Sequence, residues 1–306
     1  MSQENSIIFA KGIEKTFKDF WGRPKVKAIR GMDIDIKEGS VFGLLGPNGA
    51  GKSTFIKLLL GHLYPTAGEL TIFGKDPRDV ESKLRLGYLP ERSYMYKNLT
   101  AKETLHYFGE ILKLPKPVIK ERCDQLLEMV GLENAANRLV GGFSHGMTRR
   151  IGMAQSLLNA PDLLILDEPT AGLDPVGCRD VKDLILELSK QGKTVLVTSH
   201  LLADTQDVCD EFNIMFGGKV QVSGKTDELL KDLNTTSLKF PKVSDETLSQ
   251  VKELLRKDLG DQAIEESSPA QSLEEFFLRI VSDAHARKQE TSGAELGSGV
   301  ADFLKR

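Results

Sequence analysis

Short runs of apolar residues alternate with helical patterns along most of the chain. The run Val41-Phe-Gly-Leu-Leu45 precedes a Gly-rich turn and a helical pattern of apolar residues. Leu163-Leu-Ile-Leu166 and Thr194-Val-Leu-Val-Thr198 are two further runs, and each is again followed by a helical pattern. Short, wholly apolar strands between helices are typical of a parallel sheet that is covered on both faces. The pattern therefore predicts an α/β core, with a hairpin from Asn213 to Val222 at its edge.

The stretch from about residue 98 to 160 has a helical period and almost no strand signal. It opens on Thr100-Ala-Lys-Glu103, a capping box in which each side chain can accept from a free backbone N–H of the other residue. Leu105 and Phe108 then recur on one helical face. We interpret the stretch as a helical subdomain inserted into the α/β core.

The composition changes beyond about residue 235. Two amphipathic patterns follow, over Leu248–Leu255 and over Leu273–Val281, the second behind the capping box Ser272-Leu-Glu-Glu275. We expect a main domain over residues 1–235 and a small accessory domain over 236–285. Residues 286–306 are rich in Gly and Ser, which predicts a flexible tail.

Composition excludes several classes of function. The 306 residues are 40% hydrophobic and 28% charged, and a net charge of −3 gives no electrostatic reason to expect nucleic acid binding. Cys123, Cys178 and Cys209 have no C-x-x-C spacing, which argues against a disulfide framework and a zinc site. No apolar stretch approaches the roughly 20 residues that cross a bilayer, and the first residues are polar. We therefore expect a cytoplasmic protein whose membrane role, if any, depends on a partner.

A phosphate-binding loop follows the first apolar run. Gly46-Pro-Asn-Gly-Ala-Gly-Lys-Ser53 fits the pattern G-x-x-x-x-G-K-[ST], and it opens a helix, as the mechanism requires. Glycines let backbone N–H groups surround phosphate, Lys52 would reach the β- and γ-phosphates, and Ser53 would help to hold Mg²⁺. The residues expected to contact ATP here are Gly46, Pro47, Asn48, Gly49, Ala50, Gly51, Lys52, Ser53 and Thr54.

Two carboxylates end the run Leu163–Leu166. Asp167 is placed to ligate Mg²⁺ directly or through water, and Glu168 to polarise the attacking water as a general base. An Asp-Glu pair after a strand is by itself usually only the start of a loop. Together with the phosphate-binding loop, the pair becomes specific for nucleotide hydrolysis.

The order of further motifs resembles one family. Phe143-Ser-His-Gly-Met147, then the carboxylate pair, then Pro169-Thr-Ala-Gly-Leu-Asp174 resemble the signature, Walker B and D-loop of ABC ATPases. With Ser199-His200, the resemblance covers roughly residues 7–230. It implies a P-loop NTPase core with a mainly parallel sheet, an N-terminal antiparallel β-subdomain, an inserted helical subdomain and a small C-terminal extension that contains helix. It also implies an ATP-hydrolysing subunit of a membrane transporter.

The resemblance assigns roles to the remaining motif residues. Ser144 looks like a helix N-cap, and with Gly146 it would face the γ-phosphate bound by a second subunit in a head-to-tail dimer. His200 resembles the family's switch histidine, which hydrogen-bonds the γ-phosphate. Asp174 would bridge the two sites, although it could equally be only the N-cap before Pro175.

Three positions depart from the commonest family pattern. Glu91 stands where glutamine is usual; a carboxylate could still accept from the attacking water or reach Mg²⁺. His145 and Met147 replace a glycine and a glutamine of the signature, and we expect the His145 ring to face solvent rather than nucleotide. Phe17 matches the aromatic residue that stacks on adenine, with Phe20 and Trp21 as alternatives.

The segment Leu86-Gly-Tyr-Leu-Pro-Glu91 and Ser272–Phe277 look most like ATPases of ABC-2-type exporters. The resemblance implies a separate membrane-spanning permease, which would hold this chain on the inner face of the membrane. Exposed side chains in Tyr94-Met-Tyr96 would suit a groove for that permease, or could anchor the loop to its own domain. A nucleotide-dependent switch without transport remains an alternative function, and a small-molecule kinase is disfavoured because it would not need the signature.

Overall fold

The computed structural model describes residues 6–201, 205–230, 243–259 and 299–305. The chain divides into two units, and the first contains residues 1–229 together with 290–306. The strands of the first unit are β1 (Ser6–Lys18), β2 (Pro24–Lys37), β3 (Val41–Leu45), β4 (Ala67–Ile72), β5 (Leu86–Leu89), β6 (Leu163–Asp167), β7 (Thr194–Ser199), β8 (Glu211–Phe216) and β9 (Lys219–Lys225). Its helices are α1 (Lys52–Leu59), α2 (Val80–Leu84), α3 (Ala101–Ile111), α4 (Lys116–Met129), α5 (His145–Leu157), α6 (Pro175–Lys190) and α7 (Thr226–Leu229), with short 3-10 turns at Glu133–Ala135, Val140–Gly142 and Asp302–Leu304.

The second unit, residues 230–289, contains the helix α8 (Asp245–Leu259). This helix covers the first of the two amphipathic patterns predicted beyond residue 235. The second pattern and its capping box lie outside the described residues. In the described part of the chain, no helix is both long enough and apolar enough to cross a membrane.

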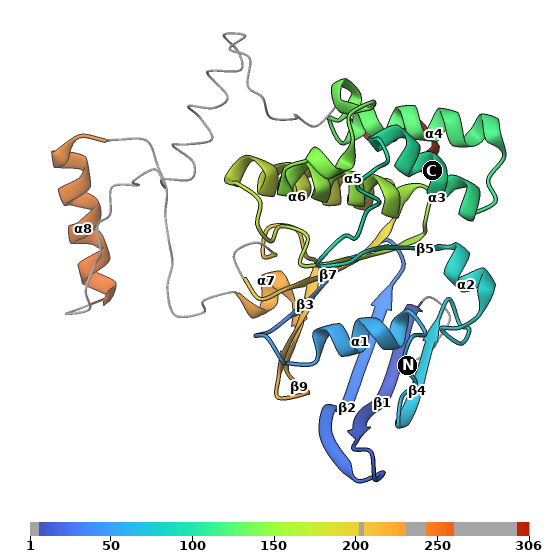
Figure 1. Ribbon diagram of the computed structural model, residues 1–306. Coiled ribbons are helices and arrows are strands. Elements are labelled where there is room, and N and C mark those ends of the chain that lie inside the picture. The colour runs from blue at the N-terminus through green and yellow to red at the C-terminus, as the bar shows by residue number, and fades with distance from the viewer. Residues whose placement is uncertain (1–5, 202–204, 231–242, 260–298, 306) are drawn as a thin grey trace. The chain divides into compact units, whose positions relative to one another are not determined.

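Two sheets form the first unit. Five parallel strands and the antiparallel β9 make the larger sheet, in the order β5-β6-β7-β3-β8-β9. The smaller sheet is antiparallel, in the order β2-β1-β4. In Figure 1 the helices α3, α4 and α5 gather at one end of this unit, and the antiparallel strands lie at the other. The α/β core, the β-subdomain, the inserted helices and the hairpin β8–β9 are thus confirmed.

The carboxyl ends of β3, β6 and β7 meet at one edge of the larger sheet because the three strands are adjacent and parallel. All residues of these strands are buried, as the unbroken apolar runs predict. Each strand is followed by a loop that carries one of the predicted motifs. The fold therefore brings those motifs together at a single edge.

The inserted helices have the predicted start. Thr100 caps α3: its hydroxyl accepts from Glu103 N at 3.1 Å, and Glu103 Oε2 accepts from Thr100 N at 2.8 Å. Leu105 on this helix and Ile119 on α4 are fully buried in the core that the helices share with the larger sheet. Local capping and one apolar stripe per helix thus account for the subdomain.

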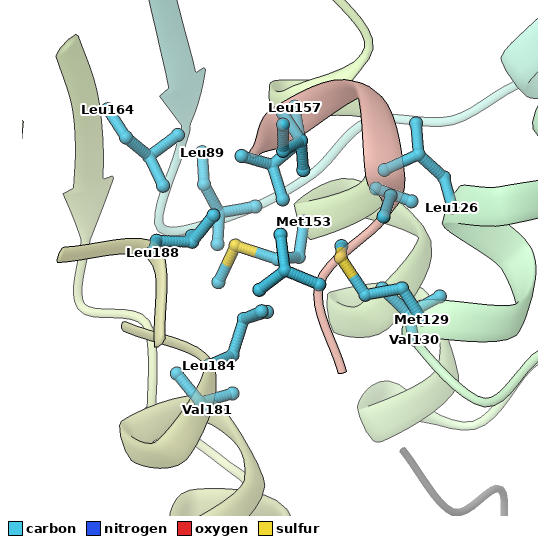
Figure 2. Close-up of a cluster of buried hydrophobic side chains, with 14 of the residues drawn as sticks. Leu89, Leu126, Met129, Val130, Met153, Leu157, Leu164, Val181, Leu184 and Leu188 are labelled. Carbon is cyan, nitrogen blue, oxygen red and sulfur yellow. The ribbon is translucent and has the colours of Figure 1, made fainter. Parts of the chain in front are cut away.

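The last described residues, 299–305, pack on this helical subdomain. Val300, Ala301 and Leu304 are buried in the same core cluster, and Leu304 has no exposed surface. Figure 2 shows this end of the chain, in faded red, passing through the cluster around Leu126 and Leu157. The flexible tail predicted over residues 286–306 is therefore corrected for these residues. This segment has only four apolar side chains in six positions. That pattern is too short to predict a packed segment directly after a Gly- and Ser-rich stretch.

We expect Leu304→Ala to lower the free energy of unfolding by about 2–5 kcal/mol, because it would leave a cavity in a closely packed core. Urea denaturation monitored by circular dichroism measures the change. Lys305→Ala is the matched control, since Lys305 is exposed, and it should change stability by no more than about 0.5 kcal/mol. Equal stability of the two variants would show that the segment is not packed as described.

Candidate nucleotide site

The loop between β3 and α1 has the geometry of a phosphate cradle. Gly46 has φ 151°, and a Cβ there would lie 2.3 Å from the main-chain oxygen of Met215, so no other residue fits. Helix α1 begins directly at Lys52, so its free N–H groups face the loop. A helix N-terminus and a glycine loop together favour an anion at this position.

Lys52 lies under this loop. Its side chain is only 6% exposed, and Nζ donates to the main-chain oxygen of Gly46 at 2.5 Å. The same Nζ forms an ion pair with Glu168 Oε1 at 3.4 Å. The ammonium group is therefore held between the loop and the carboxylate that follows β6.

Glu168 occupies an unusual backbone conformation at the end of β6. Its φ is 50°, in the left-handed region that costs a residue with a Cβ about 1–2 kcal/mol. Its backbone N–H donates to Thr198 O at 3.1 Å, which ties the turn to β7. The carboxylate is buried, and Oε2 lies 2.8 Å from His200 Nδ1. Glu168 thus contacts residues of two other predicted motifs, Lys52 and His200.

Asp167 is held by a different partner. Its Oδ1 accepts from the hydroxyl of Thr198 at 2.6 Å. Burial raises the pKa of Asp167, while this hydrogen bond opposes the rise. A cation bound here would favour the charged carboxylate, so the position suits a metal ligand electrostatically.

These groups face a cavity of about 540 Å³. Of the predicted nucleotide, catalytic and metal residues, the cavity is lined by Phe17, Pro47, Asn48, Gly49, Ala50, Gly51, Lys52, Ser53, Thr54, Glu91, Asp167, Glu168 and His200. Gly46, Ser144, Gly146 and Asp174 are not among its lining residues. In the described residues, no three His, Cys, Asp or Glu side chains come together as a metal cluster. Magnesium in nucleotide sites uses few protein ligands besides phosphate, so a hydroxyl and a carboxylate beside the loop fit that cation.

The aromatic wall of the cavity is Phe17. Its side chain is 37% exposed, whereas Phe20 and Trp21 are 94% and 74% exposed and do not line the cavity. The structure thus favours Phe17 over its two alternatives for stacking on a base. Lys27 and Arg30, on β2, also line the cavity. Neither residue belongs to a recognisable sequence motif, and basic residues on an exposed strand are usually only solvated.

Two of the predicted motif residues, Ser144 and Asp174, each begin a helix. Ser144 is the N-cap of α5, and its hydroxyl accepts from Met147 N at 3.2 Å. Asp174 caps α6 in the same way, accepting from Gly177 N at 2.8 Å, with Pro175 at the first helical position. Both capping roles are confirmed. Neither residue reaches the cavity of its own chain.

His145 has a partner that we did not anticipate. The residue is exposed, yet its ring lies against Gly172 in the loop after β6, where an added Cβ would be 2.9 Å from the ring carbon Cε1. Gly172 also has φ 74°. The backbone conformation favours glycine at this position, and the His145 ring lies between the start of α5 and that loop.

Comparison with known proteins agrees with this geometry. The family model described as "ABC transporter" matches residues 29–171. An uncharacterised ABC transporter ATP-binding protein of Nostoc sp. is 36% identical over 312 residues, covering 94% of this chain and 92% of that protein. The bacitracin transport ATP-binding protein BcrA of Bacillus licheniformis is 40% identical over 208 residues, covering 67% of each. A dimeric ATP-binding cassette in a post-hydrolysis state with ADP and Pi superposes with a TM-score of 0.65 at 26% identity, covering 72% of this chain and 98% of that one.

Proposed function

The chain belongs to the ATP-binding subunits of ABC transporters, and from that premise we propose that it works as half of a head-to-tail pair that drives export through a separate ABC-2-type permease. ATP binding and hydrolysis belong to the family. One observation supports roles for individual residues: Glu168 contacts both Lys52 and His200 beside the phosphate-binding loop.

The chain's own residues divide the work of hydrolysis. Lys52 and the N–H groups of the loop neutralise phosphate charge. Ser53 and Asp167 would hold Mg²⁺ through their oxygen atoms, with Glu91 at the same cavity. When bound, Mg²⁺ would neutralise charge on the terminal phosphates. Glu168 accepts the proton of the attacking water, and His200 hydrogen-bonds both Glu168 and the γ-phosphate.

A paired arrangement explains why the signature lies outside the cavity. Ser144 caps α5 and Gly146 lies in its first turn, where backbone N–H groups have no partner within the helix, and neither residue lines the chain's own cavity. An anion bound at this helix start must therefore come from elsewhere, and the γ-phosphate held by a second subunit fits that description. One copy alone would hold half of each composite site, with Asp174 between the two halves.

The partner in the membrane would contact the segment after Glu91. Tyr94 and Tyr96 are 87% and 53% exposed, and Tyr96 makes an edge-to-face contact with Tyr107 on α3, 5.2 Å between ring centres. Exposed aromatic residues supported by a helix suit the apolar centre of a protein interface. The resemblance of Leu86–Glu91 to ABC-2 exporters supports that class of permease and a place on the inner face of the membrane.

We expect the double variant Tyr94→Ala, Tyr96→Ala to bind ATP as the wild type does but to lose at least tenfold in transport and in co-purification with the permease. Co-expression with any polytopic membrane protein that an adjacent reading frame encodes, followed by affinity purification in detergent, tests this. Tyr64→Ala is the control, since Tyr64 is 59% exposed away from this segment. Unchanged transport by the double variant, or co-purification with a soluble protein only, would contradict the proposal; the second result would favour the nucleotide switch.

A further inference from the structure

Arg149 lies buried where two loops of the nucleotide site, after β5 and after β6, meet helix α5. It is on α5, one turn after the capping residue Ser144, and is 4% exposed. Its guanidinium points to main-chain oxygens only, within the described residues. Nε donates to Pro169 O at 3.1 Å, Nη1 to Pro90 O at 2.5 Å and Glu91 O at 3.1 Å, and Nη2 to Asp167 O and Glu168 O, both at 2.6 Å.

These contacts use the full donor capacity of arginine. A guanidinium has five N–H donors in a fixed planar fork, and each of the five has one carbonyl here. Burial lowers the pKa of Arg149 to about 10, so the group remains charged at neutral pH. A charge is costly to bury, and an apolar residue would pack at lower cost if filling space were the only requirement. The hydrogen bonds that the guanidinium donates, rather than its packing, therefore explain why an arginine is buried here.

The carbonyls that Arg149 holds surround the Glu168 turn. Nη2 bonds the oxygens of Asp167 and Glu168, the two carbonyls on either side of the backbone at φ 50°. Nη1 bonds the segment that carries Glu91, and Nε bonds the first residue of the loop after Glu168. One side chain thus fixes the two carboxylate positions relative to each other and to the helix that starts at the signature.

We propose that Arg149 is a positioning residue for hydrolysis: it holds the Glu168 turn and the Glu91 segment in register with α5. The proposal rests on the proposed role of Glu168 as general base. Arg149 does not line the nucleotide cavity, so its loss acts on the geometry of the reacting water and leaves the nucleotide contacts of Lys52 in place.

The adjacent residue offers a matched control. Arg150 lies on the same helix, and its side chain is also largely buried, at 12% exposure. Its guanidinium bonds Asp180 at 2.7 Å and the main-chain oxygen of Val130 at 3.2 Å, and both partners lie outside the two loops that Arg149 holds. Arg149→Gln and Arg150→Gln therefore remove similar groups from one helix, and only the first releases the Glu168 turn.

The test compares both variants, and Arg149→Lys, in the full chain by steady-state ATPase assays and hydrogen exchange of residues 167–173. We expect Arg149→Gln to lower kcat at least 30-fold with KM for ATP within about threefold, and to speed exchange in residues 167–173. Arg149→Lys, which has three donors on one atom, should recover less than a tenth of the activity. Arg150→Gln should keep kcat within about threefold of wild type.

Equal kcat in the two glutamine variants, or unchanged exchange of residues 167–173 in Arg149→Gln, would overturn the positioning role. If Arg149→Gln does not fold, wild-type kcat in Arg149→Lys overturns it. Absence of ATPase activity in the wild type would instead overturn the proposed function, while the exchange measurement would still decide whether Arg149 holds the turn.

Discussion

Glu168→Gln should reduce ATP turnover by about 10²–10⁴-fold while ATP binding stays within threefold of wild type. The amide keeps the size of the side chain and can still bond His200, but it cannot take a proton from water. It also lacks the charge that pairs with Lys52 at 3.4 Å, so electrostatic repulsion of the phosphates decreases. Phosphate release measures turnover, and calorimetry with ATP measures binding.

The same variant should accumulate as a nucleotide-bound dimer, because closure requires only binding and the pair cannot proceed to hydrolysis. Size-exclusion chromatography with and without ATP shows the change in mass. Glu187→Gln is the control, since Glu187 is a partly exposed residue of α6 that pairs with Lys190. Wild-type turnover by Glu168→Gln would mean that another group acts as the base.

Lys52→Met should weaken ATP binding roughly 10- to 100-fold, which is the loss expected when a charged hydrogen bond to phosphate is removed. The effect has two sources. Nζ is the buried cation at the loop, and without it Glu168 remains buried next to the phosphates with no ammonium partner. Both changes disfavour a bound polyanion.

Lys57→Met is the matched control, because Lys57 is an exposed residue of the same helix. It should bind ATP as the wild type does. Calorimetric titration of both variants decides the question. Equal affinities in the two variants would remove Lys52 from the proposed phosphate site.

The sequence predicts the parts of the site that depend on local pattern. The buried strands, the glycine loop and the caps at Thr100, Ser144 and Asp174 each have a signal within a few residues, and the structure has them in those places. The loops after β3, β6 and β7 meet at one edge of the larger sheet because these strands are parallel and adjacent. The assigned chemical roles of these residues remain predictions for the variants above.

Features that join distant segments had no such signal. Arg149 and Arg150 are consecutive basic residues of one helix, and nothing in the local sequence distinguishes them. Only the tertiary fold shows that Arg149 bonds five main-chain oxygens and Arg150 an aspartate. Strand β5 is four residues long, and β1 and β2 contain several register shifts and exposed polar positions, which obscure alternation. The domain limits predicted at 235 and 285 also differ from the division at 229 and 290.

Packing of residues 300–304 on the helical subdomain has a practical consequence for experiments on this protein. The first unit combines two stretches that are separate in the sequence, residues 1–229 and 290–306. An affinity tag fused after Arg306 would follow Phe303 by three residues, and the Phe303 ring stacks on Arg122, with 4.6 Å between the guanidinium carbon and the ring centre. Arg122 lies on α4, which contacts α5, the helix that the signature begins. A tag fused ahead of β1 would leave the contact between Phe303 and Arg122 undisturbed.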